Sequence, residues 1–155
     1  MRRALLQAVI LTLASAAMGL LVNAFSPKGI PLIRPPKLQL RDQDRIPLAE
    51  AKELWDSGTA FFLDARTPAD YAAGHIALAH NLPVEQFDQY FPKMSAMLSP
   101  DSEIIVYCDG DQCDLSHSLM TLLRERGKYV HVRVLFNGWT AWRKAGFPTT
   151  KGAEP

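Results

Sequence analysis

EIIVYCDGDQCDL, residues 103–115, is the stretch that decides the fold. Its first five residues, Glu103 to Tyr107, are rich in β-branched and aromatic side chains and predict a buried strand. From Leu115 onward, apolar residues recur at positions 115, 119, 122 and 123, which is the spacing of one helical face, and the run ends at Gly127. A strand, a short loop and a helix in this order form the repeating unit of parallel sheets covered by helices.

The sequence on both sides of this stretch continues the alternation of strand and helix. The predicted helices are 48–55 (ending at Gly58), 68–73, one or two short helices within 84–98 broken near Pro92, and 138–145. The predicted strands are 61–65 and a half-exposed strand over 130–136. Residues 75–83 are expected to be irregular. We therefore expect an α/β fold of three layers, with a central, mostly parallel sheet and helices on both faces.

Composition and charge limit the possible functions. The chain has 155 residues, of which 48% are hydrophobic and 21% charged, enough for one domain with a core and too apolar for disorder. The net charge of +1 provides no overall field that would attract nucleic acid. Residues 1–45 carry seven basic and two acidic side chains, whereas residues 46–155 carry ten basic and fourteen acidic ones. An acidic domain therefore follows a basic leader.

The N-terminal 25 residues predict a membrane segment. Arg2 and Arg3 precede Ala4 to Phe25, a run without charge that is long enough as a helix to cross about 30 Å of hydrocarbon. We favour an uncleaved transmembrane anchor, and a cleaved signal peptide is the alternative. Both place the domain outside the cytoplasm, in the periplasm or exterior, because the basic start stays inside. The remaining predicted parts are a proline-rich tether over 26–45, the folded domain over 46–150 and a tail over 151–155.

Cys108 is a candidate nucleophile because of where it lies. It follows a predicted parallel strand, and ligands of open α/β sheets bind beyond the carboxyl ends of the strands. The loop from Asp109 to Cys113 is expected to point backbone N–H groups toward it, and the next helix adds its positive end. Gly110 permits a positive φ in this loop. Such surroundings stabilise a thiolate or a bound anion, although a buried structural cysteine is the alternative.

Three motifs in this order resemble those of rhodanese-like domains. DARTPADYAAGHI, residues 64–76, with AHNLP, residues 79–83, resembles the family's first signature, and GWTAWRKAGFP, residues 138–148, resembles its C-terminal one. Between them, Cys108 occupies the position of the family's catalytic cysteine and opens a six-residue loop. The resemblance covers residues 45–150 and implies a rhodanese-like fold; three ordered motifs are more specific than any one of them.

The resemblance implies a sulfurtransferase. In that family the cysteine thiolate takes sulfane sulfur from a donor such as thiosulfate, becomes a persulfide, and passes the sulfur to a thiol or to cyanide. The implied catalytic residue is Cys108, and the implied substrate-binding residues are Asp109, Gly110, Asp111, Gln112 and Cys113. The resemblance implies no metal or organic cofactor. The implied partners are a small sulfane-sulfur donor with a thiol acceptor, or a persulfide-carrying protein.

The loop departs from the family pattern in two ways. Asp109, Asp111 and Asp114 stand where many members carry basic residues, and their charges are expected to repel thiosulfate. A neutral or cationic donor, a polysulfide or a protein persulfide is therefore an equal candidate. Cys113 ends the loop and is a candidate resolving thiol that could close a disulfide with Cys108.

Other interpretations of the same residues remain open or are disfavoured. A membrane-tethered binding module without turnover is one alternative, and a thiol redox protein is another. A phosphatase of related fold needs an arginine where Asp114 stands, and the spacing of Cys108, Cys113 and His117 matches no common zinc site. Among the scaffold residues, we expect Asp64 and Arg66 to pair with each other or with nearby loops, and His75 to be satisfied by backbone carbonyls. Trp139 and Trp142 are expected to pack the last helix, and Leu78 stands where the family usually has glycine.

Overall fold

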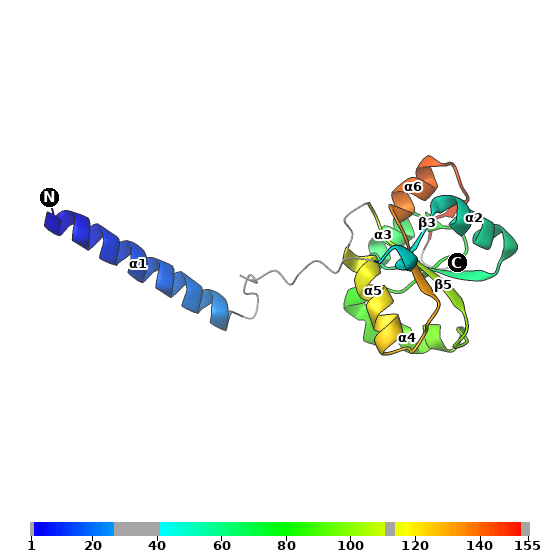
Figure 1. The fold of residues 1–155 in the computed structure, drawn as a ribbon, viewed down its shortest axis with the longest axis horizontal. Helices are drawn as coiled ribbons and strands as arrows, with labels where there is room; N and C mark the ends of the chain where they lie inside the picture. Colours follow the sequence, from blue (N-terminus) through cyan, green and yellow to red (C-terminus); the bar gives the residue numbers. More distant parts are fainter. Residues whose placement is uncertain (1, 27–40, 111–113, 153–155) are drawn as a thin grey trace. The chain divides into compact units, whose positions relative to one another are not determined.

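The computed structural model describes residues 2–26, 41–110 and 114–152, which belong to two separate units (Figure 1). The first unit is the 24-residue helix α1 (Arg2–Phe25). Among the described residues, α1 is the one helix long and apolar enough to cross a membrane by length and composition. It is apolar on all sides, which suits a lipid environment and also a signal sequence.

The second unit is built on a five-stranded parallel sheet with the strand order β1-β6-β5-β2-β4. Its strands are β1 (Arg45–Ile46), β2 (Ala60–Asp64), β4 (His80–Asn81), β5 (Glu103–Tyr107) and β6 (Val132–Leu135). The predicted strand β5 lies in the centre, with Val106 paired to Leu63 of β2 and to Val134 of β6. Its residues are apolar on both sides because both faces of the sheet are covered.

Helices cover the two faces as expected from the alternating pattern (Figure 1). They are η1 (Asp42–Asp44), α2 (Leu48–Ser57), α3 (Pro68–Ala73), η2 (Val84–Gln86), α4 (Phe87–Ser95), α5 (Asp114–Glu125) and α6 (Gly138–Lys144). Ile104 and Val106 of β5 pack in one core cluster with residues of α4 and α5, whereas Ile105 and Tyr107 pack in a second cluster with residues of α2 and α6. This confirms the three-layer α/β fold.

Local signals explain where the helices begin and end. Gly58 follows α2 with a φ of 64°, a left-handed conformation that glycine adopts without strain. Thr67 caps α3, because its Oγ1 accepts a hydrogen bond of 3.2 Å from the Asp70 amide, and Pro68 occupies the first helical position.

Three expectations from the sequence need correction. Residues 75–83 are not wholly irregular: they contain β4 and also β3 (His75–Ile76), which pairs antiparallel with β7 (Thr149–Thr150). Pro92 does not break α4, because the carbonyl of Asp88 that loses its amide partner belongs to an exposed residue and can bind water. The strand expected over 130–136 is only β6, since Val130 and Phe136 lie outside it and are exposed.

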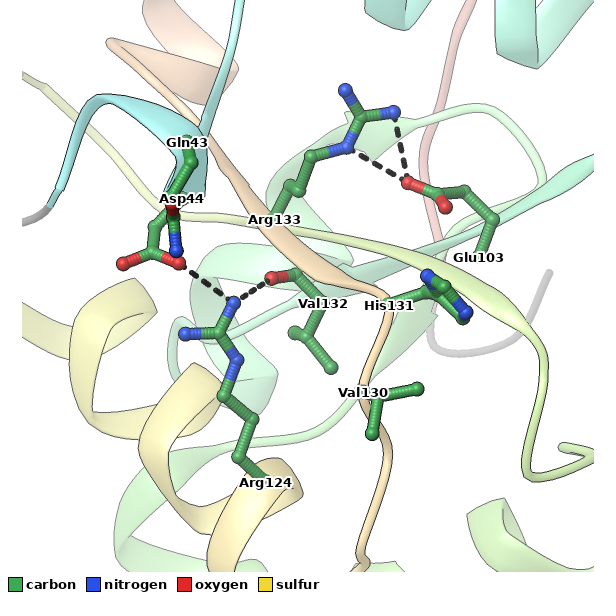
Figure 2. A pocket seen from close by; sticks show the side chains of 8 residues that line it. All are labelled: Gln43, Asp44, Glu103, Arg124, Val130, His131, Val132 and Arg133. Carbon is green, nitrogen blue, oxygen red and sulfur yellow. Dashed lines mark hydrogen bonds and ion pairs between the residues drawn. The ribbon is translucent and has the colours of Figure 1, made fainter.

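The ion pair between Arg124 and Asp44 ties η1 to α5 at the amino-terminal edge of the sheet (Figure 2). The Asp44 carboxylate is buried and accepts hydrogen bonds from Arg41 Nε at 2.9 Å and from Arg124 Nη2 at 2.8 Å. Residues 42–45, expected at the end of the tether, thus form η1 and the start of β1.

Figure 2 shows a pocket of about 200 Å³ that is lined in part by Gln43, Asp44 and Arg124. Its other arginine, Arg133, donates to Glu103 through Nε at 2.8 Å. Both arginines in the pocket therefore already hold carboxylates, and we interpret this edge as structural.

Asp44 is expected to make the stability of the domain depend on acid. The hydrogen bond from Arg41, followed by the hydrogen bond and charge of Arg124, lowers the pKa of Asp44 from 3.8 to about 2. A lowered carboxyl pKa contributes stability that is present above pH 3.8 and is lost as pH falls toward 2. Asp44→Asn should cost about 1–2 kcal/mol at neutral pH and weaken this acid dependence. Urea unfolding over a pH series measures both effects. The exposed Asp42→Asn is the matched control, and identical pH profiles for Asp44→Asn and the unsubstituted protein would contradict the expectation.

Candidate active site at the carboxyl edge of the sheet

Cys108 lies directly after the central strand and its backbone is held on two sides. The amide of Trp139, at the start of α6, donates to the Cys108 carbonyl at 3.0 Å. The amide of Ala65, just beyond β2, donates to the Tyr107 carbonyl at 2.9 Å. Cys108 is 3% exposed, and its side chain belongs to the core cluster on the α4 and α5 face. The sequence correctly places Cys108 at the end of this strand.

Gly138 packs against the backbone of this cysteine. A Cβ atom at Gly138 would lie 2.6 Å from the Cys108 carbonyl oxygen and 2.8 Å from the Tyr107 Cβ. Real Cβ contacts do not become this short, so the residue must be glycine for α6 to lie where it does. The glycine of the GW motif therefore has a physical role in the site.

Ser116 is a site residue that the sequence analysis missed. Its Oγ lies 3.3 Å from Cys108 Sγ, and the residue is buried in the first turn of α5. A detectable signal existed, because Ser116 precedes Leu119 and Leu123 by three and seven residues and so shares their inward face. The structure thus brings a hydroxyl group to the sulfur of the candidate nucleophile.

Of the predicted loop, the structure describes Asp109 and Gly110. Gly110 has a φ of 80°, the left-handed conformation predicted for it. Asp109 is exposed, and its carboxylate accepts a hydrogen bond from Thr140 Oγ1 in α6. The other predicted loop residues, Asp111, Gln112 and Cys113, lie outside the described residues, so the anion cradle and the resolving thiol remain predictions.

Cys108 is disulfide-bonded in this structure. The sulfur in this form carries no proton, so in the contact with Ser116 the hydroxyl group is the donor. Any role of Cys108 as a nucleophile requires its reduction first.

A buried polar network lies beneath the site on the other face of the sheet. Arg66 pairs with Asp64 at 2.6 Å, as the sequence predicts, and also donates to the Gly74 carbonyl at 2.7 Å. The Tyr107 hydroxyl accepts a hydrogen bond from the Ile76 amide at 3.1 Å. Burial would lower the pKa of Arg66, but the hydrogen bond and charge of Asp64 outweigh it and raise that pKa. Burial, together with the charge of Asp64, raises the pKa of Tyr107 well above its ordinary value.

The remaining scaffold residues occupy the expected positions. His75 is buried, with Nδ1 2.8 Å from the Tyr71 carbonyl and its ring stacked on Tyr71; its Nε2 has no hydrogen-bond partner among the described residues. Trp139 and Trp142 are buried around α6, as predicted. Leu78 has a φ of 66° and is exposed, so it occupies a conformation that favours the glycine usual in similar domains.

A parallel sheet with a cysteine at the end of its central strand, followed by a loop and a helix, defines the class of this domain. The profile of the rhodanese-like domain family matches residues 47–145, and the chain belongs to this family.

Two curated relatives contain similar domains within longer chains. The HTH-type transcriptional regulator Rv0324 of Mycobacterium tuberculosis is 32% identical over 111 residues, which are 72% of this chain and 46% of the regulator. The tRNA uridine(34) hydroxylase of Salmonella newport is 31% identical over 80 residues, 50% of this chain and 23% of the hydroxylase. The chain therefore spans less than half the length of these curated relatives.

Two solved structures share the fold. The rhodanese-like domain of the Alr3790 protein from Anabaena sp. is 30% identical, with a TM-score of 0.58 over 71% of this chain and 80% of that domain. The human single-domain sulfurtransferase TSTD1 is 22% identical, with a TM-score of 0.54 over 65% of this chain and 96% of its own. The second likeness concerns the fold alone.

Proposed function

We propose that this domain transfers sulfane sulfur and carries it as a persulfide on Cys108. The observation that carries the proposal is the placement of Cys108, which lies at the carboxyl end of the central strand and ahead of α5 in a rhodanese-like domain. Its backbone is held by Trp139 and by the close approach of Gly138. A nucleophile fixed in this way needs little reorganisation when it reacts.

The reaction consists of two displacements at sulfur. The Cys108 thiolate attacks the sulfane sulfur of the donor; a bond forms to Sγ, the donor's bond to that sulfur breaks, and its electron pair leaves with the rest of the donor. An acceptor thiolate then attacks the outer sulfur of the persulfide, and the pair from the broken bond restores the Cys108 thiolate. The two steps need no oxidant or reductant. The disulfide form of Cys108 first requires exchange with a thiol.

Ser116 supports this chemistry by donating a hydrogen bond to the sulfur of Cys108. A hydrogen bond to a charged group contributes about 1.5–3 kcal/mol. Ser116→Ala is therefore expected to move the pH midpoint of Cys108 alkylation upward by about one to two units, because thiolate forms less readily. Alkylation rates of the reduced protein with iodoacetamide, followed by intact mass over a pH series, measure the shift. Ser118→Ala, exposed on the same helix, is the control. Coincident profiles for Ser116→Ala and the control would exclude the contact as a source of thiolate stability.

Turnover tests the proposal as a whole. Reduced protein is mixed with thiosulfate or with inorganic polysulfide, and sulfide release to dithiothreitol is followed. We expect turnover with at least one donor and its loss in Cys108→Ser. Two observations support the alternative, a binding module without turnover: Cys108 has a low exposure, and acidic residues lie near it. A rate equal to the protein-free reaction with both donors would contradict sulfur transfer and leave the alternatives without turnover.

We further propose that α1 anchors the protein in the inner membrane, with the domain in the periplasm or exterior. The length and uniform apolarity of α1 support this, as does the basic start at Arg2 and Arg3. The cleaved signal peptide is the alternative. The intact mass of protein recovered from expressing cells distinguishes them, because only the anchored form retains residues 2–25.

A further inference from the structure

A small pocket of about 80 Å³ lies on the same face of the sheet as the Cys108 side chain. Three segments form it: the connection after β2, the η2 turn with the residue before it, and the first turn of α5. The lining residues are Ala65, Thr67, Pro68, Pro83, Val84, Glu85, Gln86 and Leu115.

The register of the sheet places this pocket beside the nucleophile. Asp64 pairs with Tyr107 across β2 and β5, so the next residues along, Ala65 and Cys108, leave the sheet side by side. Cys108 and Ala65 also belong to one core cluster, against which Val84 and Leu115 pack. Cys108 does not itself line the pocket, but the pocket lies beside the strand end that carries it.

The lining of the pocket is mostly apolar and its volume is small. Alanine, valine, leucine and two prolines supply most of the lining. The volume is several times the roughly 10–15 Å³ that one water molecule needs in such a cavity, so the pocket has room for a short alkyl chain. Inorganic thiosulfate and polysulfide contain no alkyl group that this lining would bind.

The charges around the pocket are negative. Glu85 lines it directly, and Thr67 Oγ1 donates to Asp70 Oδ2 at 2.6 Å, which holds a second carboxylate at the rim. Asp114, exposed in α5, precedes the lining residue Leu115.

Of the basic side chains on neighbouring elements, three arginines are engaged elsewhere, and Lys93, exposed on α4, acts on His80. Arg66 is paired with Asp64, and both Arg66 and Arg143 lie over the ring of Trp139, which packs in the core cluster of the opposite face. Arg126, at the end of α5, is bound to Asp88. The carboxylates therefore dominate the charge at the pocket.

We propose that this pocket binds the alkyl part of a small thiol that carries no net negative charge, and that this thiol is the sulfur acceptor. The inference rests on the proposed function and names its substrate class. The acceptor sulfur, as thiolate, bonds to the outer sulfur of the Cys108 persulfide; the bond between the two persulfide sulfurs breaks, and its electron pair remains on Sγ. The product is the persulfide of the small thiol. Because the step is reversible, the same pocket binds that persulfide when it acts as donor.

The test uses the reduced full chain, loaded with persulfide by polysulfide, desalted, and checked by intact mass. Loss of the outer sulfur is then timed with 1-propanethiol, cysteamine and 3-mercaptopropionate, which are neutral, cationic and anionic thiols of similar size. Rates are expressed per thiolate and divided by the rates of the same thiols with free cysteine persulfide. We expect the relative rates of the neutral and cationic thiols to be about ten times that of the anionic thiol. The reason is that carboxylates a few ångström away repel the carboxylate of 3-mercaptopropionate.

Two substitutions make the test specific. Glu85→Gln should reduce the discrimination against 3-mercaptopropionate, whereas Glu53→Gln, exposed on α2 of the opposite face, should not. Val84→Phe should slow 1-propanethiol by filling the pocket. Equal relative rates for the three thiols, together with no effect of Glu85→Gln and Val84→Phe, would contradict the proposal that this pocket binds the acceptor. The proposal of sulfur transfer by Cys108 would not be affected. Failure of the unsubstituted protein to form a persulfide would overturn both proposals.

Discussion

Replacing Arg66 with methionine is expected to lower the free energy of unfolding by about 3–5 kcal/mol. The side chain of Asp64 is fully buried, and Arg66 is its ion-pair partner at 2.6 Å. Methionine would leave the carboxylate uncompensated in the interior and would also remove the donor to the Gly74 carbonyl. Urea unfolding of the reduced domain measures the loss.

Two controls separate this effect from a general loss of packing. Arg143→Met removes the other guanidinium over the Trp139 ring, but that residue is exposed, so the expected cost is below about 1 kcal/mol. In the double variant Asp64→Leu and Arg66→Met, no unpaired charge remains, and much of the stability should return. An Arg66→Met variant as stable as Arg143→Met would show that the buried pair is not what holds this edge of the sheet.

The second large effect is expected at Gly138. An added methyl group would lie 2.6 Å from the Cys108 carbonyl oxygen, so Gly138→Ala must move either α6 or the cysteine backbone. We expect a cost of about 1–3 kcal/mol in stability and a fall of about a hundredfold in the rate of persulfide formation. The rate is measured by intact mass at a temperature where the variant is folded.

Met94→Ala distinguishes displacement of the site from simple destabilisation. Met94 is buried in α4, and its truncation is expected to cost about 2–5 kcal/mol while leaving the rate of persulfide formation unchanged. If Gly138→Ala forms persulfide as fast as Met94→Ala, the close approach of α6 has no part in positioning Cys108.

The parts of the fold that the sequence predicts are those with a strong local pattern. β5 and α5 follow from a β-branched run and from helical spacing, and Gly58 marks the end of α2. The two-residue strands β3 and β4 have no such pattern, because a periodicity of two cannot be read from two residues. The helix continues through Pro92 at a place where Asp88, four residues earlier, is exposed, and this exposure is set by the packing of the domain.

The site also has features that the sequence predicts and features that it does not. The position of Cys108 at the end of a strand is a local property and was predictable, as was the left-handed Gly110. The contacts of Cys108 with Gly138 and Ser116 join segments that are far apart or separated by a loop. Chain spacing alone does not encode such contacts, although the inward face of α5 would have identified Ser116 as a residue to inspect.

The most direct test of the central claim is the intact mass of the fully reduced protein before and after reaction with thiosulfate, polysulfide or cysteamine persulfide. The account predicts a gain of about 32 Da, one sulfur atom, that is lost on adding dithiothreitol and is absent in Cys108→Ser. No gain with any of the three donors, or the same gain in Cys108→Ser, would contradict the assignment of Cys108 as the sulfur carrier.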